Sequence, residues 1–368
     1  MKNYLTAEIS ASAVRHNIAV LRELIGHDVK LCPVVKDDCF GHGMDVLYPV
    51  LAELVDGFAV ASPLEALDLR SKGYKGFILC FLSAYFDDFE IQDELVRQGI
   101  TQTVMSKSAL ASIQAASRRV GGTAPVHLKV DTGMGRLGVL AGQAKDMIVS
   151  VDETSGIELT GLYTHFASAD EADRESVVHQ LETFKSILPE PNKIIRHAAN
   201  SASTIDLPET YFDMVRPGIA VYGYHPSDQL QNHLGLKPCM SVHAKLIAVK
   251  HVPEGSRSGY GLTHEFKRDS RIGIVPIGYG DGYFRCLSNK AVVRINGQEA
   301  PVCGRVSMDQ MTVDVTDIGD VKVGDVVEVI SADSEAPNCV ENLARLADTI
   351  PYEITCHLGH NMRHVLVD

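Results

Sequence analysis

Short apolar runs alternate with longer segments whose apolar residues recur at helical spacing between residues 6 and 222. Apolar runs that stop at turn residues are typical of buried strands, and a 3.6-residue period is typical of amphipathic helices. The pattern predicts strands at residues 6–8, 30–36, 57–61, 76–82, 101–105, 126–130, 157–166, 194–198 and 214–215. It predicts helices at residues 10–24, 44–55, 63–72, 87–98, 107–120, 143–151 and 170–188, with a further short segment at 200–205.

This order predicts an α/β fold for the first two-thirds of the chain. Roughly eight strand-then-helix units are present, which matches the unit number and length of a (β/α)8 TIM-like barrel. A doubly wound open sheet would show the same alternation, so periodicity leaves that fold open as well. We expect the barrel, with chemistry at the carboxyl ends of its strands.

The last third of the chain has a different pattern. Short strands are predicted at residues 242–251, 271–277, 291–295, 299–302, 310–314 and 326–330, with one late helix at 340–348. Glycine and aspartate turns separate these strands, as expected of a mainly β domain. We therefore divide the chain into a barrel, residues 1–234, and a β domain, residues 235–368.

Composition argues against several classes of partner. The net charge of −13 argues against nucleic acid or an anionic membrane surface, and no apolar run is long enough to span a bilayer. The amino-terminal residues contain no signal-peptide pattern. The eight cysteines include no CxxC pair, so we expect reduced thiols in a cytoplasmic protein.

Lys36 is the first residue along the chain whose position suggests a catalytic role. The apolar run from Leu31 to Val35 ends at this lysine, and a polar, glycine-containing turn from Asp37 to Gly43 follows. A lysine amine at the carboxyl end of a barrel strand could act as a nucleophile or a base. A solvated lysine at the end of a strand would show the same pattern.

Later strand ends carry further polar side chains. They include Lys129, Asp131 and Arg136 in a glycine-rich turn, His165, the pair Asn200 and Ser201, and the segment Arg216 to Ile219. Ser201 and the backbone beside Gly218 could bind an anion. Each residue singly has a structural explanation, as an ion-pair arginine, a core histidine or a helix cap. Together they predict a phosphorylated cofactor held as a Schiff base.

Several motifs in order along the whole chain resemble those of the alanine racemases. They are Val34–Gly43, Lys129–Gly138, His197–Ala202, Arg216–Gly223, Ser258–Gly261, Pro276–Gly282, Gly304–Asp309 and Ile350–Glu353. The resemblance implies a (β/α)8 barrel with a C-terminal β domain, pyridoxal 5'-phosphate as cofactor and no metal. It also implies a homodimer with shared active sites that racemises alanine and supplies D-alanine for a bacterial cell wall.

The same resemblance implies a role for each matching residue. Lys36 would hold the cofactor and act as one acid/base, and Tyr260 of the second subunit would act as the other. Arg216 would face the pyridine nitrogen, and His165 would hydrogen-bond Arg216. The remaining cofactor contacts would come from Asn200, Ser201, Gly218, Ile219 and Tyr352.

The substrate end of the implied site has its own residues. Arg136 would lie near the substrate carboxylate, helped by Met308 of the second subunit. Lys129 would be carbamylated, as in some members of the family, and would orient Arg136. Tyr279 of the second subunit would line the entrance.

Phe40 departs from the family pattern, in which a tyrosine hydroxyl at this position contacts the phosphate. Losing a hydrogen bond to a charged group costs about 1.5–3 kcal/mol when nothing replaces it. Substrate identity stays open between alanine and serine or a broader set of small amino acids, because a small pocket discriminates poorly between them. Two further functions stay open, a decarboxylase on the same architecture and a non-catalytic cofactor-binding protein.

Overall fold

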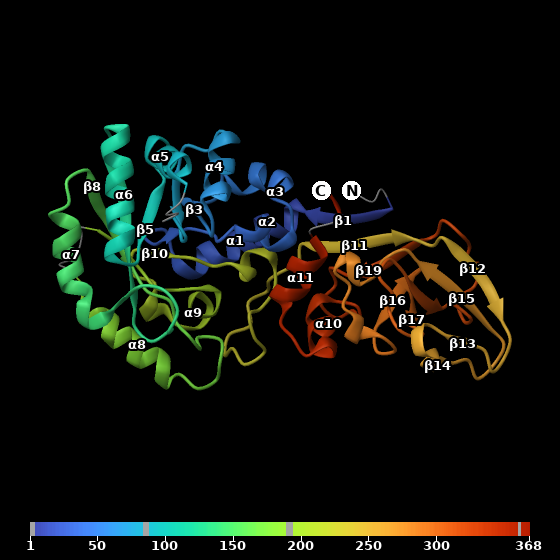
Figure 1. Ribbon diagram of the computed structural model, residues 1–368. Helices are drawn as coiled ribbons and strands as arrows, with labels where there is room; N and C mark the ends of the chain where they lie inside the picture. Colours follow the sequence, from blue (N-terminus) through green and yellow to red (C-terminus); the bar gives the residue numbers. More distant parts are fainter. Residues whose placement is uncertain (1–3, 84–87, 189–193, 360–361) are drawn as a thin grey trace.

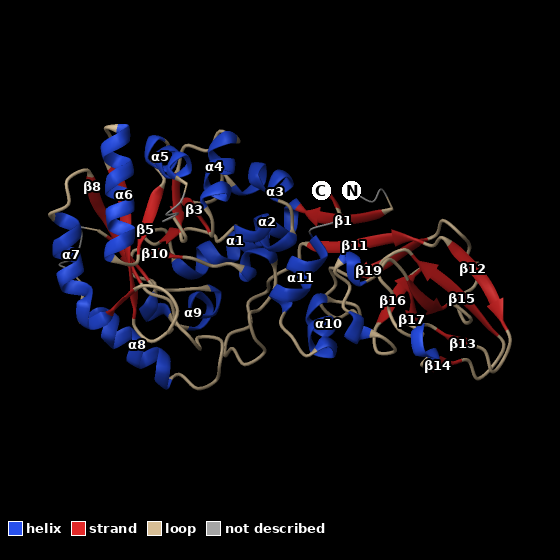
Figure 2. Ribbon diagram, in the orientation of Figure 1, coloured by secondary structure: helices blue, strands red, loops and turns tan. Residues whose placement is uncertain are grey.

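The computed structural model describes residues 4–83, 88–188, 194–359 and 362–368. Figure 1 shows two bodies side by side, one with strands surrounded by helices and one built mainly of strands. The first strand of the chain and its carboxyl-terminal end lie at the junction of the two bodies (Figure 1). Figure 2 shows that the two bodies differ in secondary structure, because most of the helices belong to the first body.

Eight parallel strands form the first body within the described residues. They are β2 (Lys30–Leu31), β3 (Gly57–Val60), β4 (Phe77–Cys80), β5 (Thr101–Val104), β6 (Ala124–Asp131), β8 (Ile157–Tyr163), β9 (Ile195–His197) and β10 (Met214–Val215). Strands β3, β4, β5, β6, β8 and β9 are hydrogen-bonded in that order, and β10 pairs with β2. Two backbone hydrogen bonds, each 2.9 Å long, join these two sets of strands into a closed ring. Ala59 N donates to Pro33 O, and Arg216 N donates to Ala199 O. This closure confirms the barrel and excludes the open sheet.

Helices cover the outside of the barrel, as the sequence pattern predicted. They are α1 (Ala11–Ile25), α3 (Met44–Leu51), α4 (Pro63–Ser71), α5 (Phe89–Arg97), α6 (Lys107–Val120), α7 (Ala144–Asp152), α8 (Glu175–Lys185) and α9 (Ser201–Asp206). The bounds of α6 coincide with the prediction because local signals mark both ends. Ser106 accepts a hydrogen bond from Ala109 N, and Gly121 ends the helix with φ 72°.

A six-stranded sheet forms the centre of the second body, in the order β17, β16, β19, β11, β1, β20. Its strands are β1 (Leu5–Ser10), β11 (Met240–Lys245), β16 (Val292–Ile295), β17 (Gln298–Pro301), β19 (Val326–Ile330) and β20 (Arg363–Val367). The first strand of the chain therefore belongs to this sheet. It pairs antiparallel with β11 and parallel with β20, although residues 6–8 were expected to begin the barrel series.

The remaining elements complete the second body and its contact with the barrel. Strands β12 (Ala248–Val252), β15 (Ser270–Val275) and β18 (Met311–Asp314) form one sheet, and β13 (Arg257–Ser258) pairs with β14 (His264–Glu265). Helices α10 (Val340–Ala347) and α11 (Pro351–Gly359) follow, and α11 packs against α2 (Lys36–Gly41) of the barrel. The short strand β7 (Val139–Leu140) pairs with β6. Helix α11 and strand β20 had no counterpart among the predicted elements.

The state of the cysteines and the length of the helices can be read directly from the structure. All eight cysteines are free thiols, and Cys286 is the exposed one among them. Across the described ranges, the helices are too short or too polar to cross a bilayer.

Candidate active site

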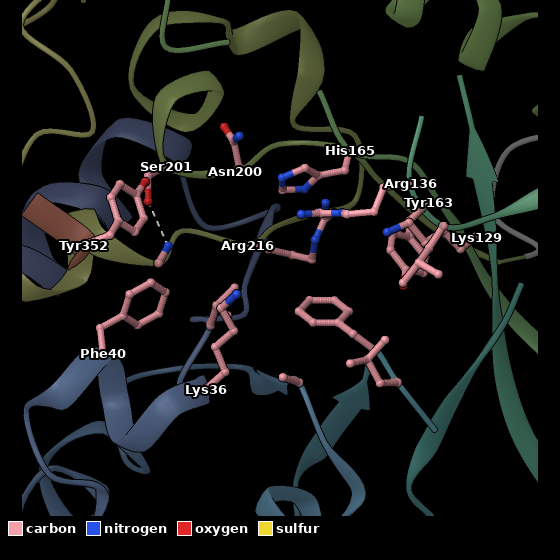
Figure 3. Close-up of a pocket in the computed structure, with 16 residues that line it drawn as sticks. Lys36, Phe40, Lys129, Arg136, Tyr163, His165, Asn200, Ser201, Arg216 and Tyr352 are labelled. Atoms are coloured by element: carbon pink, nitrogen blue, oxygen red, sulfur yellow. Dashed lines mark hydrogen bonds between the residues drawn. The ribbon is translucent and has the colours of Figure 1, made fainter. Parts of the chain in front are cut away.

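A cavity of about 360 Å³ opens at the carboxyl ends of the barrel strands (Figure 3). Four of its lining side chains are cationic, and no carboxylate lines it among the residues described. The lining residues are Val34, Lys36, Phe40, Ala61, Phe81, Leu82, Lys129, Arg136, Leu137, Tyr163, His165, Asn200, Ser201, Arg216, Gly218 and Tyr352. The barrel thus brings together most of the residues that the sequence singled out. In a chain of net charge −13, this cavity favours an anionic ligand.

Lys36 begins a left-handed turn, residues 36–43, which we call the lysine turn. The four residues Asp37, Asp38, Cys39 and Phe40 have φ between 50° and 57°, although none is glycine. The left-handed conformation costs about 1–2 kcal/mol for each non-glycine residue, so the turn carries a strain of about 4–8 kcal/mol. Backbone strain of this kind persists where surrounding contacts enforce it, and it is concentrated at functional sites.

Hydrogen bonds from several sides enforce the lysine turn. Asp37 N donates to Glu65 Oε1 at 2.8 Å, and Met44 N donates to Asp38 Oδ1 at 2.6 Å. His42, itself part of the turn, is fully buried, and its Nδ1 is 2.9 Å from Cys39 O and 3.0 Å from Phe40 O. These carbonyls can only accept, so Nδ1 carries the hydrogen. Burial lowers the pKa of His42 to about 3 and keeps it neutral.

Arg216 follows strand β10 and lies buried behind the cavity. Its Nη1 is 2.6 Å from Nδ1 of His197, and its Nη2 donates to Thr164 O at 2.9 Å and to Ala198 O at 3.0 Å. The histidine that hydrogen-bonds Arg216 is therefore His197, and the expected bond from His165 was wrong. Burial lowers the pKa of Arg216 to about 10, so the guanidinium stays protonated at neutral pH.

A second buried imidazole extends this contact. Nε2 of His197 is 2.8 Å from Nδ1 of His127, and both rings are fully buried. Arginine has only donors, so His197 accepts at Nδ1, donates from Nε2 to His127, and leaves the hydrogen of His127 on Nε2. A Cβ atom at Gly161 would clash with this Nε2, so glycine makes room for the ring. The sequence interpretation assigned no role to His127.

The two buried imidazoles are held neutral. Burial and then the charge of Arg216 lower the pKa of His127 to about 3 and the pKa of His197 well below its ordinary value. Tyr163 stacks on His197 with ring centroids 4.7 Å apart and planes 7° apart. The hydrogen bonds from Arg216 to His197 and from His197 to His127 therefore fix the orientation of the guanidinium from inside the barrel.

One end of the cavity contains Lys129, Arg136 and His165 (Figure 3). Burial, then the charges of Arg136 and Arg216, lower the pKa of Lys129 to about 8. Burial and Arg216 lower the pKa of His165 to about 3. Asp131 holds the loop of Arg136 by accepting hydrogen bonds from Gly133 N, Gly135 N and Arg136 N at 3.0–3.1 Å.

Hydroxyl groups and backbone N–H groups gather at the opposite end of the cavity. Ser201 Oγ accepts hydrogen bonds from Gly218 N at 2.8 Å and Ala220 N at 3.3 Å, and the Tyr352 hydroxyl faces the same serine. Asn200 caps α9 by accepting from Ser203 N, which is its structural explanation, and it also lines the cavity. Ile219 is buried behind Gly218 and does not line the cavity. This end offers the donors that a phosphate group requires.

Phe40 lies at this same end (Figure 3). Its ring centroid is 5.8 Å from that of Tyr352, and a Cβ atom at Gly218 would lie 2.8 Å from Phe40 Cζ. The para carbon of the ring therefore points at the backbone of Gly218. Phe40 therefore presents an apolar ring edge, without a hydroxyl, at this end of the cavity.

Like Ile219, the expected active-site residues Tyr260 and Met308 lie outside the cavity. Tyr260 is 69% exposed and Met308 is 55% exposed, and neither lines the cavity. They belong to adjacent segments, because Ser258 Oγ donates to Cys303 O at 3.1 Å and Gly280 N donates to Met308 O at 2.8 Å. Tyr279 is also exposed beside Met308. The second body thus presents one surface of large exposed side chains, formed by Tyr260, Leu262, Tyr279 and Met308.

Comparison with known proteins places both bodies in one family. A family model described as alanine racemase, N-terminal domain, matches residues 9–226, and one described as alanine racemase, C-terminal domain, matches residues 239–366. An alanine racemase of Halothermothrix orenii is 38% identical over 365 residues, which cover 97% of this chain and 95% of that protein. An alanine racemase of Methanococcus maripaludis is 41% identical over 358 residues, which cover 95% of each.

Solved structures agree with these relatives. The alanine racemase of the D-cycloserine producer Streptomyces lavendulae superposes with a TM-score of 0.92 at 34% identity, covering 100% of this chain and 98% of that one. An alanine racemase of Clostridium difficile 630 gives a TM-score of 0.92 at 33% identity, covering 100% and 96%.

Proposed function

This chain belongs to the alanine racemase family, and from that premise we propose that it interconverts L-alanine and D-alanine with pyridoxal 5'-phosphate held at Lys36. The observation that carries the proposal is the charge of the cavity. Lys36, Lys129, Arg136 and Arg216 line it without a carboxylate among the described residues. A phosphate and a substrate carboxylate would supply the anions that this donor set fits.

The proposed orientation follows from the two ends of the cavity. Ser201, Tyr352 and the backbone at Gly218 would hold the phosphate, with Asn200 beside them. Ile219, whose side chain is buried outside the cavity, would contribute only its backbone N–H. Arg216 would face the ring nitrogen and His165 would line the ring pocket. When bound, pyridoxal 5'-phosphate supplies an electron sink for the charge left on the substrate Cα.

Arg216 would leave the ring nitrogen without a proton. Its guanidinium stays protonated, because a pKa of about 10 is still well above neutral pH, and it can only donate hydrogen bonds. His197 and His127 hold it in place. A decarboxylase on this architecture would be expected to place an acid there, and the described lining residues contain no carboxylate.

Racemisation requires one acid/base group on each face of Cα. Lys36 would take or return the proton on one face, and Tyr260 of a second copy of the chain would do so on the other. The exposure of Tyr260, Tyr279 and Met308 on one surface supports this arrangement, because these side chains have no place in the cavity of their own chain. The proposed enzyme is therefore a homodimer whose active sites contain residues of both copies.

Lys129 would carry a carbamate that pairs with Arg136 near the substrate carboxylate. A pKa of about 8 leaves part of its amine neutral at physiological pH. The neutral amine would add to CO2, forming an N–C bond and releasing one proton to solvent. Burial, then repulsion by Arg136, lowers this pKa, and the resulting anion would replace that repulsion with attraction.

Activity is tested by incubating the purified protein with pyridoxal 5'-phosphate and L-alanine and measuring D-alanine by chiral chromatography. A panel of other L-amino acids, with L-serine first, separates an alanine racemase from one of broad specificity. A bound chromophore without any racemisation would instead favour a cofactor-binding protein.

A mixing experiment tests the sharing of sites between two copies. Lys36→Ala and Tyr260→Phe homodimers should each be nearly inactive. When subunits exchange, each heterodimer would hold one intact site and one doubly altered site, so about a quarter of the wild-type activity should return. If both residues acted within one chain, every site of the mixture would lack one base and no activity would return.

A further inference from the structure

The lysine turn is held from outside the barrel by the carboxyl-terminal end of the chain. Nε2 of His364, in β20, is 2.9 Å from the carbonyl oxygen of Gly41. The same ring lies against Gly43, where a Cβ atom would be 2.7 Å from His364 Cγ. The imidazole therefore both packs on the turn and donates to the Gly41 carbonyl, since that carbonyl can only accept.

Helix α11 encloses the same part of the turn. A Cβ atom at Gly41 would clash with Thr355 O, and a Cβ atom at Gly359 would clash with Gly41 O. Both glycines are buried. The backbone of the lysine turn thus sits between α11 and His364, with no room for a side chain on either glycine.

Strand β20 keeps His364 in a fixed position. It pairs in parallel with β1 from Thr6↔Arg363 to Ser10↔Val367. The carboxylate of Asp368, the last residue, accepts hydrogen bonds from Ser12 N and Ser12 Oγ, each 3.0 Å long. The carboxyl-terminal strand is therefore anchored on both sides of the histidine, and it can resist movement of the turn.

We propose that His364 is a positioning residue for Lys36, and that its hydrogen bond to Gly41 keeps the strained lysine turn in the geometry that directs the amine into the cavity. This inference rests on the proposed role of Lys36 as the attachment point of pyridoxal 5'-phosphate. The strain of the four left-handed residues is the physical reason, because a strained turn relaxes when a contact that enforces it is lost.

The test compares His364→Phe, His364→Gln and Arg363→Gln in the full-length protein. Phenylalanine keeps a ring over Gly43 but removes the donor, and glutamine places an amide N–H near the position of Nε2. Arg363 is exposed on the same strand and serves as the matched control. Hydrogen exchange of the peptide covering residues 36–44 is measured before cofactor is added, and the release rate of bound pyridoxal 5'-phosphate is measured afterwards.

We expect His364→Phe to accelerate exchange of the turn and release of the cofactor about tenfold each, which is the effect of losing one hydrogen bond. His364→Gln should restore both rates, and Arg363→Gln should change neither. Unchanged exchange in His364→Phe overturns the proposal, and so does faster exchange with unchanged release. Failure of the wild-type protein to bind the cofactor would overturn the proposed function, while the exchange data would still report on His364.

Discussion

Acidification should destabilise this protein well above the pH at which carboxylates titrate. Three histidines, His42, His127 and His197, are fully buried. Burial is the largest cause of the lowered pKa of each, and the pKa is about 3 for His42 and His127. Protonating His197 would also place a cation 2.6 Å from the guanidinium of Arg216.

The sign and size follow from proton linkage. An unfolded histidine has a pKa of about 6.5, so the unfolded chain binds more protons than the folded one between that pH and about 3. The contribution of each neutral imidazole is complete above pH 6.5 and is lost as the pH falls. Between pH 7.5 and 5.5 each loses about 1.3 kcal/mol, and the three together lose about 4 kcal/mol.

Other titratable groups change the stability at a different pH or oppose the loss of stability caused by the three histidines. The pKa of His165 is also lowered, mainly by burial, and adds to the effect. Burial raises the pKa of Glu341, which therefore binds protons more readily when folded and offsets part of the loss as the pH falls. For Asp56 and Asp213, hydrogen bonds outweigh burial and lower the pKa, so these carboxylates act below about pH 4.

The assay is urea unfolding at pH 7.5, 6.5 and 5.5, at one protein concentration, for wild type, His127→Gln and His251→Gln. Glutamine at position 127 retains an acceptor for His197 but does not titrate. The His127→Gln protein should lose less stability between pH 7.5 and 5.5 than the wild type, by about 1.3 kcal/mol. The exposed His251 is the control. Equal losses in wild type and His127→Gln would refute the reasoning.

Three further predictions concern the cofactor and the charges around it. Phe40→Tyr should tighten binding of pyridoxal 5'-phosphate about 10- to 100-fold, because a hydroxyl toward Gly218 gains a hydrogen bond to phosphate worth about 1.5–3 kcal/mol; unchanged affinity would show that the phosphate does not reach this ring. Arg216→Glu should raise the share of turnovers that end in transamination, since an acid can keep the ring nitrogen protonated, and an unchanged ratio of pyridoxamine phosphate to racemised alanine contradicts this. Lys129 should show a carbamate carbon signal with ¹³C-bicarbonate that grows as the pH rises through about 8; no signal at pH 9 would rule the carbamate out.

The barrel could be predicted from the sequence because its strands and helices have different periods. The first strand was placed in the wrong sheet, although its pattern held a signal. Leu5, Ala7 and Ile9 are buried and alternate with less buried residues, whereas all four residues of β3 are buried. Alternation is typical of a sheet with one solvated face, and continuous burial is typical of a barrel strand. The pairing itself could not be seen, since β11 and β20 lie far along the chain.

The cavity residues were predicted largely through motifs, and the errors lie in how they contact one another. Both His165 and His197 follow or end neighbouring strands, so sequence order gave no means of choosing which one meets Arg216. His197 makes this contact because β9 lies beside the segment of Arg216, as the hydrogen bond from Arg216 N to Ala199 O shows. His127 could not be found because its role depends on His197.

No feature of the sequence predicted the left-handed conformation of the lysine turn. This conformation explains why Glu65 and the carboxyl-terminal residues, which are distant in sequence, both contact the turn. The backbone preference of each residue opposes left-handed Asp37, Asp38, Cys39 and Phe40, so the local hydrogen bonds of the turn need support from long-range contacts. Those contacts come from Glu65 in the barrel and from α11 and His364 near the carboxyl terminus. Like-charged side chains converge in the same cavity, where they oppose one another until an anion binds. Strain and uncompensated charge thus coincide at one place, and a ligand that binds only the folded state would offset both.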